Sequence, residues 1–256
     1  MVALGYHDVV REQSRETVGF SGPMAARYKL HPDRFEAHLD AIARVGRRVG
    51  VVEPDGPLPE VALTFDDGGS SALSAAAAVE RRGWRAHFFV TTGRIGTAGF
   101  LSEDGIRELV RRGHVVGSHT HTHPTYIGQL PRAAIDTEWR RSRAVLTDVL
   151  GEPPPLASVP GGFLSRAVIE SAAAAEYRVL MTSEPVARIR RRGGVLLLGR
   201  FTIRASTPAE RAAAYVRGAW RPRAQIWVSW NVKKVAKRSS PATYEAGRRL
   251  ANRIDH

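Results

Sequence analysis

The chain has 256 residues, of which 43% are apolar, a formal net charge of +13 and no cysteine. It is long enough to bury a full core, and the lack of cysteine excludes thiol nucleophiles, disulfides and cysteine-ligated zinc sites. The basic residues are dispersed rather than gathered into one tract, so no specific nucleic-acid binding is expected. No apolar run is long enough for a membrane span. The first ten residues lack the basic and apolar regions of a secretory signal, which predicts a cytoplasmic location.

Short apolar runs alternate with helical patterns along the chain. The expected strands are residues 2–6, 61–65, 86–90, 114–118, 156–159, 177–182, 195–198 and 225–229. The expected helices are residues 33–45, 70–82, a helix opened by Ser102, and residues 131–150, 165–175, 207–216 and 241–252. This alternation predicts an α/β fold, a distorted (β/α) barrel of about seven to eight strands, in one domain over residues 1–256. Chemistry in such barrels gathers at the carboxyl ends of the strands.

Two adjacent carboxylates, Asp66 and Asp67, follow an expected strand within the sequence Thr-Phe-Asp-Asp-Gly of residues 64–68. Like charges in one site oppose each other's ionisation, and a cation beside them relieves that cost. A solvated turn is the alternative interpretation, because Asp-Asp-Gly-Gly is also good turn chemistry.

Three histidines, His119, His121 and His123, follow another expected strand. Neutral imidazoles are common ligands of zinc and similar cations. His119 and His123 share a face if the segment forms one helical turn, whereas His121 could replace one of them if the segment is extended. Ligand type does not choose between zinc, cobalt, nickel and manganese.

Together, these two motifs resemble those of the polysaccharide deacetylases with NodB homology, also described as carbohydrate esterase family 4-like. The first motif of that family reads TFDDG, and the second reads H-(S/T)-x-x-H-P, as residues 119–124 do here. The resemblance implies that Asp67, His119 and His123 hold one divalent metal ion, with zinc favoured. Asp66 would then be the general base when metal-activated water attacks the N-acetyl group of an amino sugar. Two imidazoles and one carboxylate leave coordination positions open, as a catalytic site requires.

The third family motif, R-x-P-Y-G, is altered to Ser-Val-Pro-Gly-Gly in residues 158–162. The backbone N–H of Gly161 could still donate to the oxyanion. In the family the arginine orients the catalytic aspartate, and Ser158 replaces it here. Arg200, at the end of an expected strand, is the candidate substitute, and a surface charge is the alternative for this residue.

The fifth family motif, L-x-H, supplies the histidine that protonates the leaving amine, and residues 226–231 contain no histidine. His7 is the tentative replacement acid, and Glu184 is a weaker candidate. Aromatic rings can stack on the apolar faces of sugars. The candidate substrate-binding residues are Pro160, Gly162, Phe163, Trp227 and Trp230.

The predicted substrate is an N-acetylated sugar: an oligosaccharide, a lipid-linked glycan or a small glycoside. An O-acetyl esterase, or a deformylase or other amide hydrolase on the same fold, is an alternative, because an ester leaving group needs less protonation. A catalytically silent carbohydrate-binding relative is a further alternative. Retention of Asp66 argues against it, since a binding protein has no need of a base.

Overall fold

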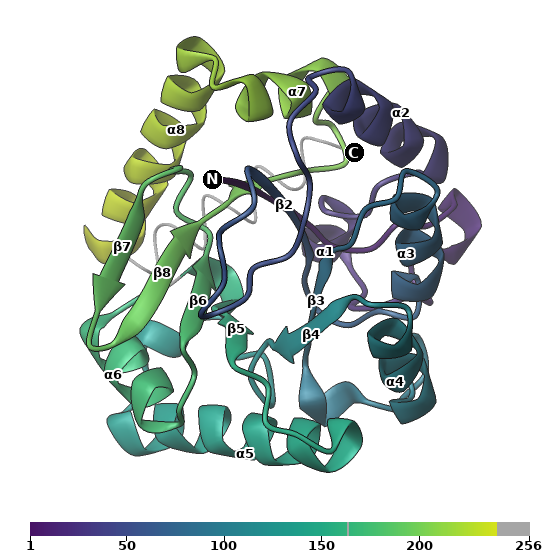
Figure 1. Cartoon of the computed structure of the whole chain (residues 1–256). Coiled ribbons are helices and arrows are strands. Elements are labelled where there is room, and N and C mark those ends of the chain that lie inside the picture. Colours follow the sequence, from purple (N-terminus) through teal and green to yellow (C-terminus); the bar gives the residue numbers. More distant parts are fainter. Residues whose placement is uncertain (163, 240–256) are drawn as a thin grey trace.

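The structure is a computed structural model that describes residues 1–162 and 164–239 (Figure 1). Its strands are β1 Val2–Tyr6, β2 Val61–Phe65, β3 His87–Val90, β4 Val115–Ser118, β5 Leu156–Ser158, β6 Val179–Thr182, β7 Ile189–Arg192, β8 Val195–Gly199 and β9 Phe201–Thr202. Its helices are α1 Pro23–Ala26, α2 Pro32–Ala43, α3 Ala72–Glu80, α4 Glu103–Arg111, α5 Arg132–Leu150, α6 Arg166–Ala174, α7 Ala209–Arg217 and α8 Trp220–Ser239. The expected strand–helix alternation is confirmed.

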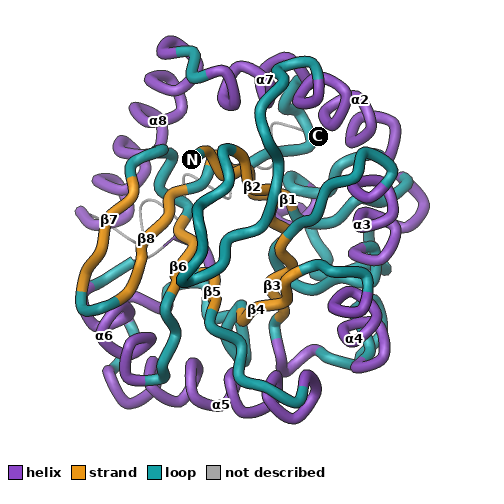
Figure 2. The backbone as a smooth tube through the Cα atoms, viewed as in Figure 1, coloured by secondary structure: helices purple, strands orange, loops and turns teal. Residues whose placement is uncertain are grey.

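The strands form one curved sheet in the order β7-β8-β6-β5-β4-β3-β2-β1-β9, and helices surround it (Figure 2). All neighbouring strands pair in parallel except β7 and β8, which form an antiparallel hairpin at one edge. β8 and β9 lie toward opposite ends of this order, yet only Arg200 separates them in the chain. At Arg200 the chain therefore passes from one side of the strand order to the other. We call this junction between β8 and β9 the seam of the distorted α/β barrel.

The residues of the parallel strands are almost all buried, as in parallel strands covered by helices, whereas the four residues of the edge strand β7 are exposed. Alternate residues of β1 enter different apolar clusters, because successive side chains of a strand point to opposite faces. Val2 and Leu4 join the cluster that includes the buried residues of α2 and α3. Ala3 joins Ala62 and residues of β6 and β8 in a second cluster. Side chains therefore pack both faces of the sheet, which holds the carboxyl ends of its strands in fixed positions.

The expected strand at residues 225–229 is wrong, because these residues belong to α8. Ile226 packs against the core, while the next two residues, Trp227 and Val228, are 47% and 53% exposed. A short apolar run does not distinguish a strand from a helix, and this one follows the helical period. The expected helix at residues 241–252 lies outside the described residues. Among the described helices, none combines the length and apolar character needed to cross a bilayer.

Candidate metal centre and catalytic base

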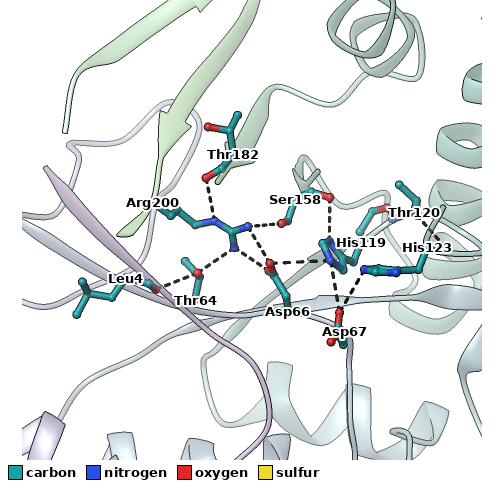
Figure 3. Close-up of polar contacts among 11 residues, drawn as sticks. Leu4, Thr64, Asp66, Asp67, His119, Thr120, His123, Ser158, Thr182 and Arg200 are labelled. Atoms are coloured by element: carbon teal, nitrogen blue, oxygen red, sulfur yellow. Dashed lines mark hydrogen bonds and ion pairs between the residues drawn. The ribbon is translucent and has the colours of Figure 1, made fainter. Parts of the chain in front are cut away.

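The two aspartates lie in a tight turn at the carboxyl end of β2 (Figure 3). The Asp66 N–H donates to the Tyr6 carbonyl at 3.0 Å, which continues the pairing of β2 with β1. Asp67 and Gly68 then adopt left-handed backbone conformations, with φ of 78° and 79°. A Cβ at position 68 would lie 3.0 Å from Val90 Cγ1, so the close approach to β3 requires glycine there. The turn brings both carboxylates into one site.

The histidine segment after β4 is a loop rather than the helical turn that the sequence suggested as one option. Thr120 and His123 have positive φ values of 66° and 60°. The Glu138 carboxylate of α5 holds the loop by accepting the N–H groups of His121 and Thr122 at 2.9 and 2.8 Å. This tertiary support stabilises a backbone conformation that is uncommon outside glycine.

Within that loop, His119 and His123 turn toward Asp67, with ring centroids 4.9 Å apart. His121 lies elsewhere, with its Nδ1 3.0 Å from Thr92 Oγ1. The sequence left open which two histidines lie near the aspartate, and in the structure they are His119 and His123. The loop brings them there through residues with left-handed backbone conformations, not through a helical turn.

Asp67, His119 and His123 form a cluster whose ligand atoms all lie within 4.8 Å of one another. Asp67 Oδ1 is 3.5 Å from the Nε2 atoms of both histidines, and this buried oxygen has no hydrogen-bond partner among the described residues. His119 Nδ1 lies 3.0 Å from the Ser158 carbonyl, which can only accept, so Nδ1 carries the proton. The lone pair of Nε2 then faces the cluster, as a metal ligand requires.

The protonation states of these groups also fit a divalent cation. Burial lowers the pKa of His119 to about 3 and lowers that of His123, so both rings are neutral near pH 7. Burial, together with the negative charge of Asp66, raises the pKa of Asp67 to about 7. A cation at this site would remove the cost of ionising Asp67. Neutral nitrogens and one carboxylate form the donor set that zinc and related metals accept.

Asp66 is clamped by Arg200, the residue at the barrel seam (Figure 3). Arg200 Nη1 and Nη2 donate to Asp66 Oδ1 and Oδ2 at 2.7 and 2.8 Å. Nη2 also donates to Ser158 Oγ at 2.7 Å, and Nη1 donates to Thr64 Oγ1 at 3.1 Å. Arg200 is only 1% exposed, which excludes the surface-charge interpretation. Burial alone would raise the pKa of Asp66, but the Arg200 charge and hydrogen bonds, with His119, hold it well below its usual range.

A groove of about 1350 Å³ opens onto these residues. Asp66, Asp67, His119 and His123 line its inner part. The segment of residues 20–28 forms part of its wall, and Tyr28 stacks on His7 with ring centroids 4.6 Å apart. No sequence motif marked this segment, and only its place in the fold reveals it.

Residues 54–180 match the family model for polysaccharide deacetylase. This segment of the chain therefore has the sequence pattern of a polysaccharide deacetylase domain. The putative polysaccharide deacetylase YxkH of Bacillus subtilis (strain 168) is 27% identical over 134 residues, which cover 52% of this chain and 48% of that protein. The chain thus spans about half the length of this curated relative.

Solved deacetylase structures share the fold. The polysaccharide deacetylase BC0361 from Bacillus cereus matches with a TM-score of 0.71 and 21% identity, over 84% of this chain and 68% of that chain. IcaB from Ammonifex degensii matches with a TM-score of 0.67 and 25% identity, over 84% of this chain and 96% of that chain. The NodB-type fold expected from the motifs is confirmed.

Some of the remaining predicted residues line the groove and others do not. His7 lines the groove beside Asp66 and Asp67, and its buried Nδ1 has no hydrogen-bond partner among the described residues. Gly161 and Gly162 also line the groove, and Gly161 has a φ of 60°. Pro160 is buried and does not contribute to the wall. Phe163 lies outside the described residues.

Helix α8 directs the two candidate tryptophans, Trp227 and Trp230, to different surroundings. Trp230 lines the groove together with Ile226 and Ser229, whereas Trp227 is absent from its described lining and is 47% exposed. The helical period turns Trp227 away, although an extended strand was expected there. Glu184 pairs with Arg190 and is likewise absent from the described groove lining.

Proposed function

We propose that residues 1–256 form one NodB-homology deacetylase domain that removes an N-acetyl group from an amino sugar with the help of one zinc ion. Asp67, His119 and His123 would hold the ion. The observation that carries this proposal is the juxtaposition of the three ligand atoms with a separate, buried and ionised carboxylate. Asp66 Oδ2 lies 3.9 Å from His119 Nε2. The substrate is an oligosaccharide, a lipid-linked glycan or a small glycoside, and the cytoplasmic location stays a prediction.

When bound, the cation supplies Lewis-acid polarisation of the acetyl carbonyl and lowers the pKa of the attacking water. Asp66 takes the proton from that water. Each carboxylate oxygen can accept two hydrogen bonds, so the Arg200 clamp leaves Asp66 with free acceptor capacity. The clamp also fixes the plane of the carboxylate, which aligns the base before the substrate arrives.

Two further groups complete the proposed reaction. Gly161 lies in the groove wall, where its backbone N–H would be the donor to the developing oxyanion. His7 lines the same groove with an unpartnered buried Nδ1, and imidazole is a common general acid. We assign His7 the role of delivering a proton to the leaving amine.

Cleavage of an O-acetyl ester, a formamide or another amide is the second candidate function. The absence of the family's fifth-motif histidine from residues 226–231 favours the ester among these, because an alkoxide leaves with less protonation than an amine. Matched N-acetyl and O-acetyl oligosaccharides separate these candidates through the ratio of their rates.

The ligand assignment is tested by measuring bound metal in protein purified without a histidine tag and reconstituted with zinc. We expect near-stoichiometric zinc in the wild type and its loss in His119→Ala, with acetate release from N-acetylglucosamine oligosaccharides lost in parallel. His121→Ala is the matched control, since His121 lies in the same loop but bonds Thr92. The assignment fails if His119→Ala retains zinc, and the proposed reaction fails if the zinc-loaded wild type releases no acetate.

A further inference from the structure

The groove that reaches the metal centre has an unbalanced distribution of charge along its length. Among its described lining residues, Asp66 and Asp67 are the acidic ones, and both belong to the centre itself. Arg27, Arg204 and Arg211 also line the groove. We call these three residues the arginine arm.

The backbone around the arginine arm is fixed by hydrogen bonds. The Arg204 N–H donates to Thr207 Oγ1, and the Thr207 N–H donates back to the Arg204 carbonyl, both at 2.9 Å. The N–H of Ala205, the next residue, donates to the Arg27 carbonyl at 2.8 Å. A closed turn is thereby attached to the Arg27 segment, so two members of the arm are held beside each other.

The guanidinium of Arg204 makes no hydrogen bond or ion pair with another described side chain, and the residue is exposed. Arg211 Nη1 donates to the neutral amide of Gln225 at 2.8 Å rather than to a carboxylate. Arg204, Arg211 and Tyr215 all line the groove, and the charges of the two arginines lower the pKa of Tyr215 against the raising effect of burial.

Some surface arginines elsewhere pair with acids, whereas Arg204 and Arg211 have no acidic partner among the described residues. Arg82 pairs with Glu36 and Asp40, and Arg178 pairs with Asp55. Two neighbouring guanidiniums without a carboxylate partner leave positive charge in a groove, where it attracts anions.

The arm lies close to the reacting centre along the chain. Arg204 follows Arg200, the clamp of Asp66, by four residues, and a fully extended chain of that length spans at most about 14 Å. A sugar chain whose acetyl group reaches the metal centre thus has its neighbouring unit within range of the arm. Guanidinium forks bind carboxylate and phosphate through paired hydrogen bonds.

We propose that the arginine arm binds a carboxylate or phosphate group that the substrate carries beyond its acetylated sugar. This inference rests on the proposed function, because it places the acetyl group at the metal centre. It narrows the substrate class from neutral N-acetylated glycans to anionic ones.

The test compares acetate release per acetyl group from chemically matched pairs at low ionic strength. One pair is a hyaluronan tetrasaccharide, which carries carboxylates, and the methyl ester of the same tetrasaccharide, which is neutral. The other is diacetylchitobiose 1-phosphate and diacetylchitobiose. We expect kcat/KM to favour at least one anionic member by about tenfold, since exposed charge-assisted contacts are partly screened. Arg204→Ala with Arg211→Ala removes that preference, and added salt weakens it. The control Arg140→Ala, an exposed arginine on α5, retains it.

Binding of the same oligosaccharides to the metal-free protein, measured by calorimetry, separates the two proposals. If no compound releases acetate but the anionic ones bind about tenfold tighter and lose this advantage in the double variant, the reaction is wrong and the arm stands. If acetate is released with equal efficiency from neutral and anionic partners, the proposed role of the arginine arm is wrong and the proposed deacetylation is supported. A preference for only the carboxylate or only the phosphate compound identifies the source of the anion.

Discussion

The metal centre receives its parts from two regions that are built in different ways. The ends of β2 and β4 supply Asp66, Asp67, His119 and His123 from two short segments whose residue types follow the family motifs. The region from β8 to α8 departs from those motifs, yet it delivers Arg200 to the same carboxylate. A contact that the family makes from the third motif is made here from the barrel seam. The comparison indicates that a charge can be supplied from another part of the chain while the proposed metal ligands keep their places.

The largest expected effect on activity comes from substitution of Asp66, which belongs to the segment that follows the family motif. Asp66→Asn removes the proton acceptor but none of the proposed metal ligands. We expect acetate release to fall by about 10⁴-fold, at the upper end of what general base catalysis contributes, with bound zinc unchanged. Steady-state kinetics and metal analysis of the same preparation check this. Activity within tenfold of the wild type would remove Asp66 from the mechanism.

The contribution of the region from β8 to α8 is tested by moving its arginine from position 200 to position 158. Arg200→Ser leaves Asp66 buried without its partner, so we expect a loss of about 10³-fold in kcat and about 3 kcal/mol in unfolding free energy. The variant Ser158→Arg combined with Arg200→Ser restores an arginine at the third-motif position. We expect it to recover at least part of both losses, as measured by kinetics and urea denaturation. No recovery, in a variant that still binds zinc, would show that the two positions are not interchangeable.

Substitution of His7 should have a smaller effect on activity, and one that differs between amide and ester substrates. If His7 protonates the leaving amine, His7→Gln should slow N-acetyl hydrolysis by about 10²-fold and O-acetyl hydrolysis by much less. The ratio of the two rates is the measurement. Equal losses on amide and ester would indicate that His7 acts through packing against Tyr28 and not as an acid.

The smallest effect is expected at His87, the first residue of β3. Its Nε2 accepts the Val52 N–H at 2.8 Å, its Nδ1 lies 3.1 Å from the Leu63 carbonyl, and burial lowers its pKa to about 4. The unfolded chain takes up this proton near pH 6.5 and the native chain only near pH 4, so stability falls as pH falls through this window.

Between pH 7 and pH 5, His87 should account for a loss of about 2 kcal/mol in unfolding free energy. Urea denaturation of the wild type and of His87→Gln, which keeps an acceptor and a donor, measures the difference in pH dependence. Identical pH dependence in the two proteins would exclude His87 as the cause.

The sequence predicted those features that depend on neighbouring residues. Residues 2–6 and 61–65 were predicted as strands with the bounds that the structure gives, because each is a short apolar run between polar segments. The proposed ligands were identified by motif, since the residue types lie at fixed spacing. The left-handed conformations of Thr120 and His123 were not predicted, because the loop between them is held by Glu138 from a helix distant in sequence.

Features that depend on topology could be predicted only in part. Arg200 was selected as a candidate, but its contact with Asp66 requires the chain to cross the seam, which no local pattern encodes. The run at residues 226–228 fitted a strand as well as a helix, and the structure places it in α8. The wall formed by residues 20–28 and the arginine arm came into view only through the fold.

The position of Arg200 has a consequence for the order in which a ribosome makes the active site. The proposed ligands all lie within the first 123 residues, whereas Arg200 lies at the junction that completes the ring of strands. A nascent chain therefore contains every group for holding the metal well before it contains the group that aligns the base. Translation up to residue 199 yields a chain that contains the three proposed ligands but lacks the arginine that holds the proposed base.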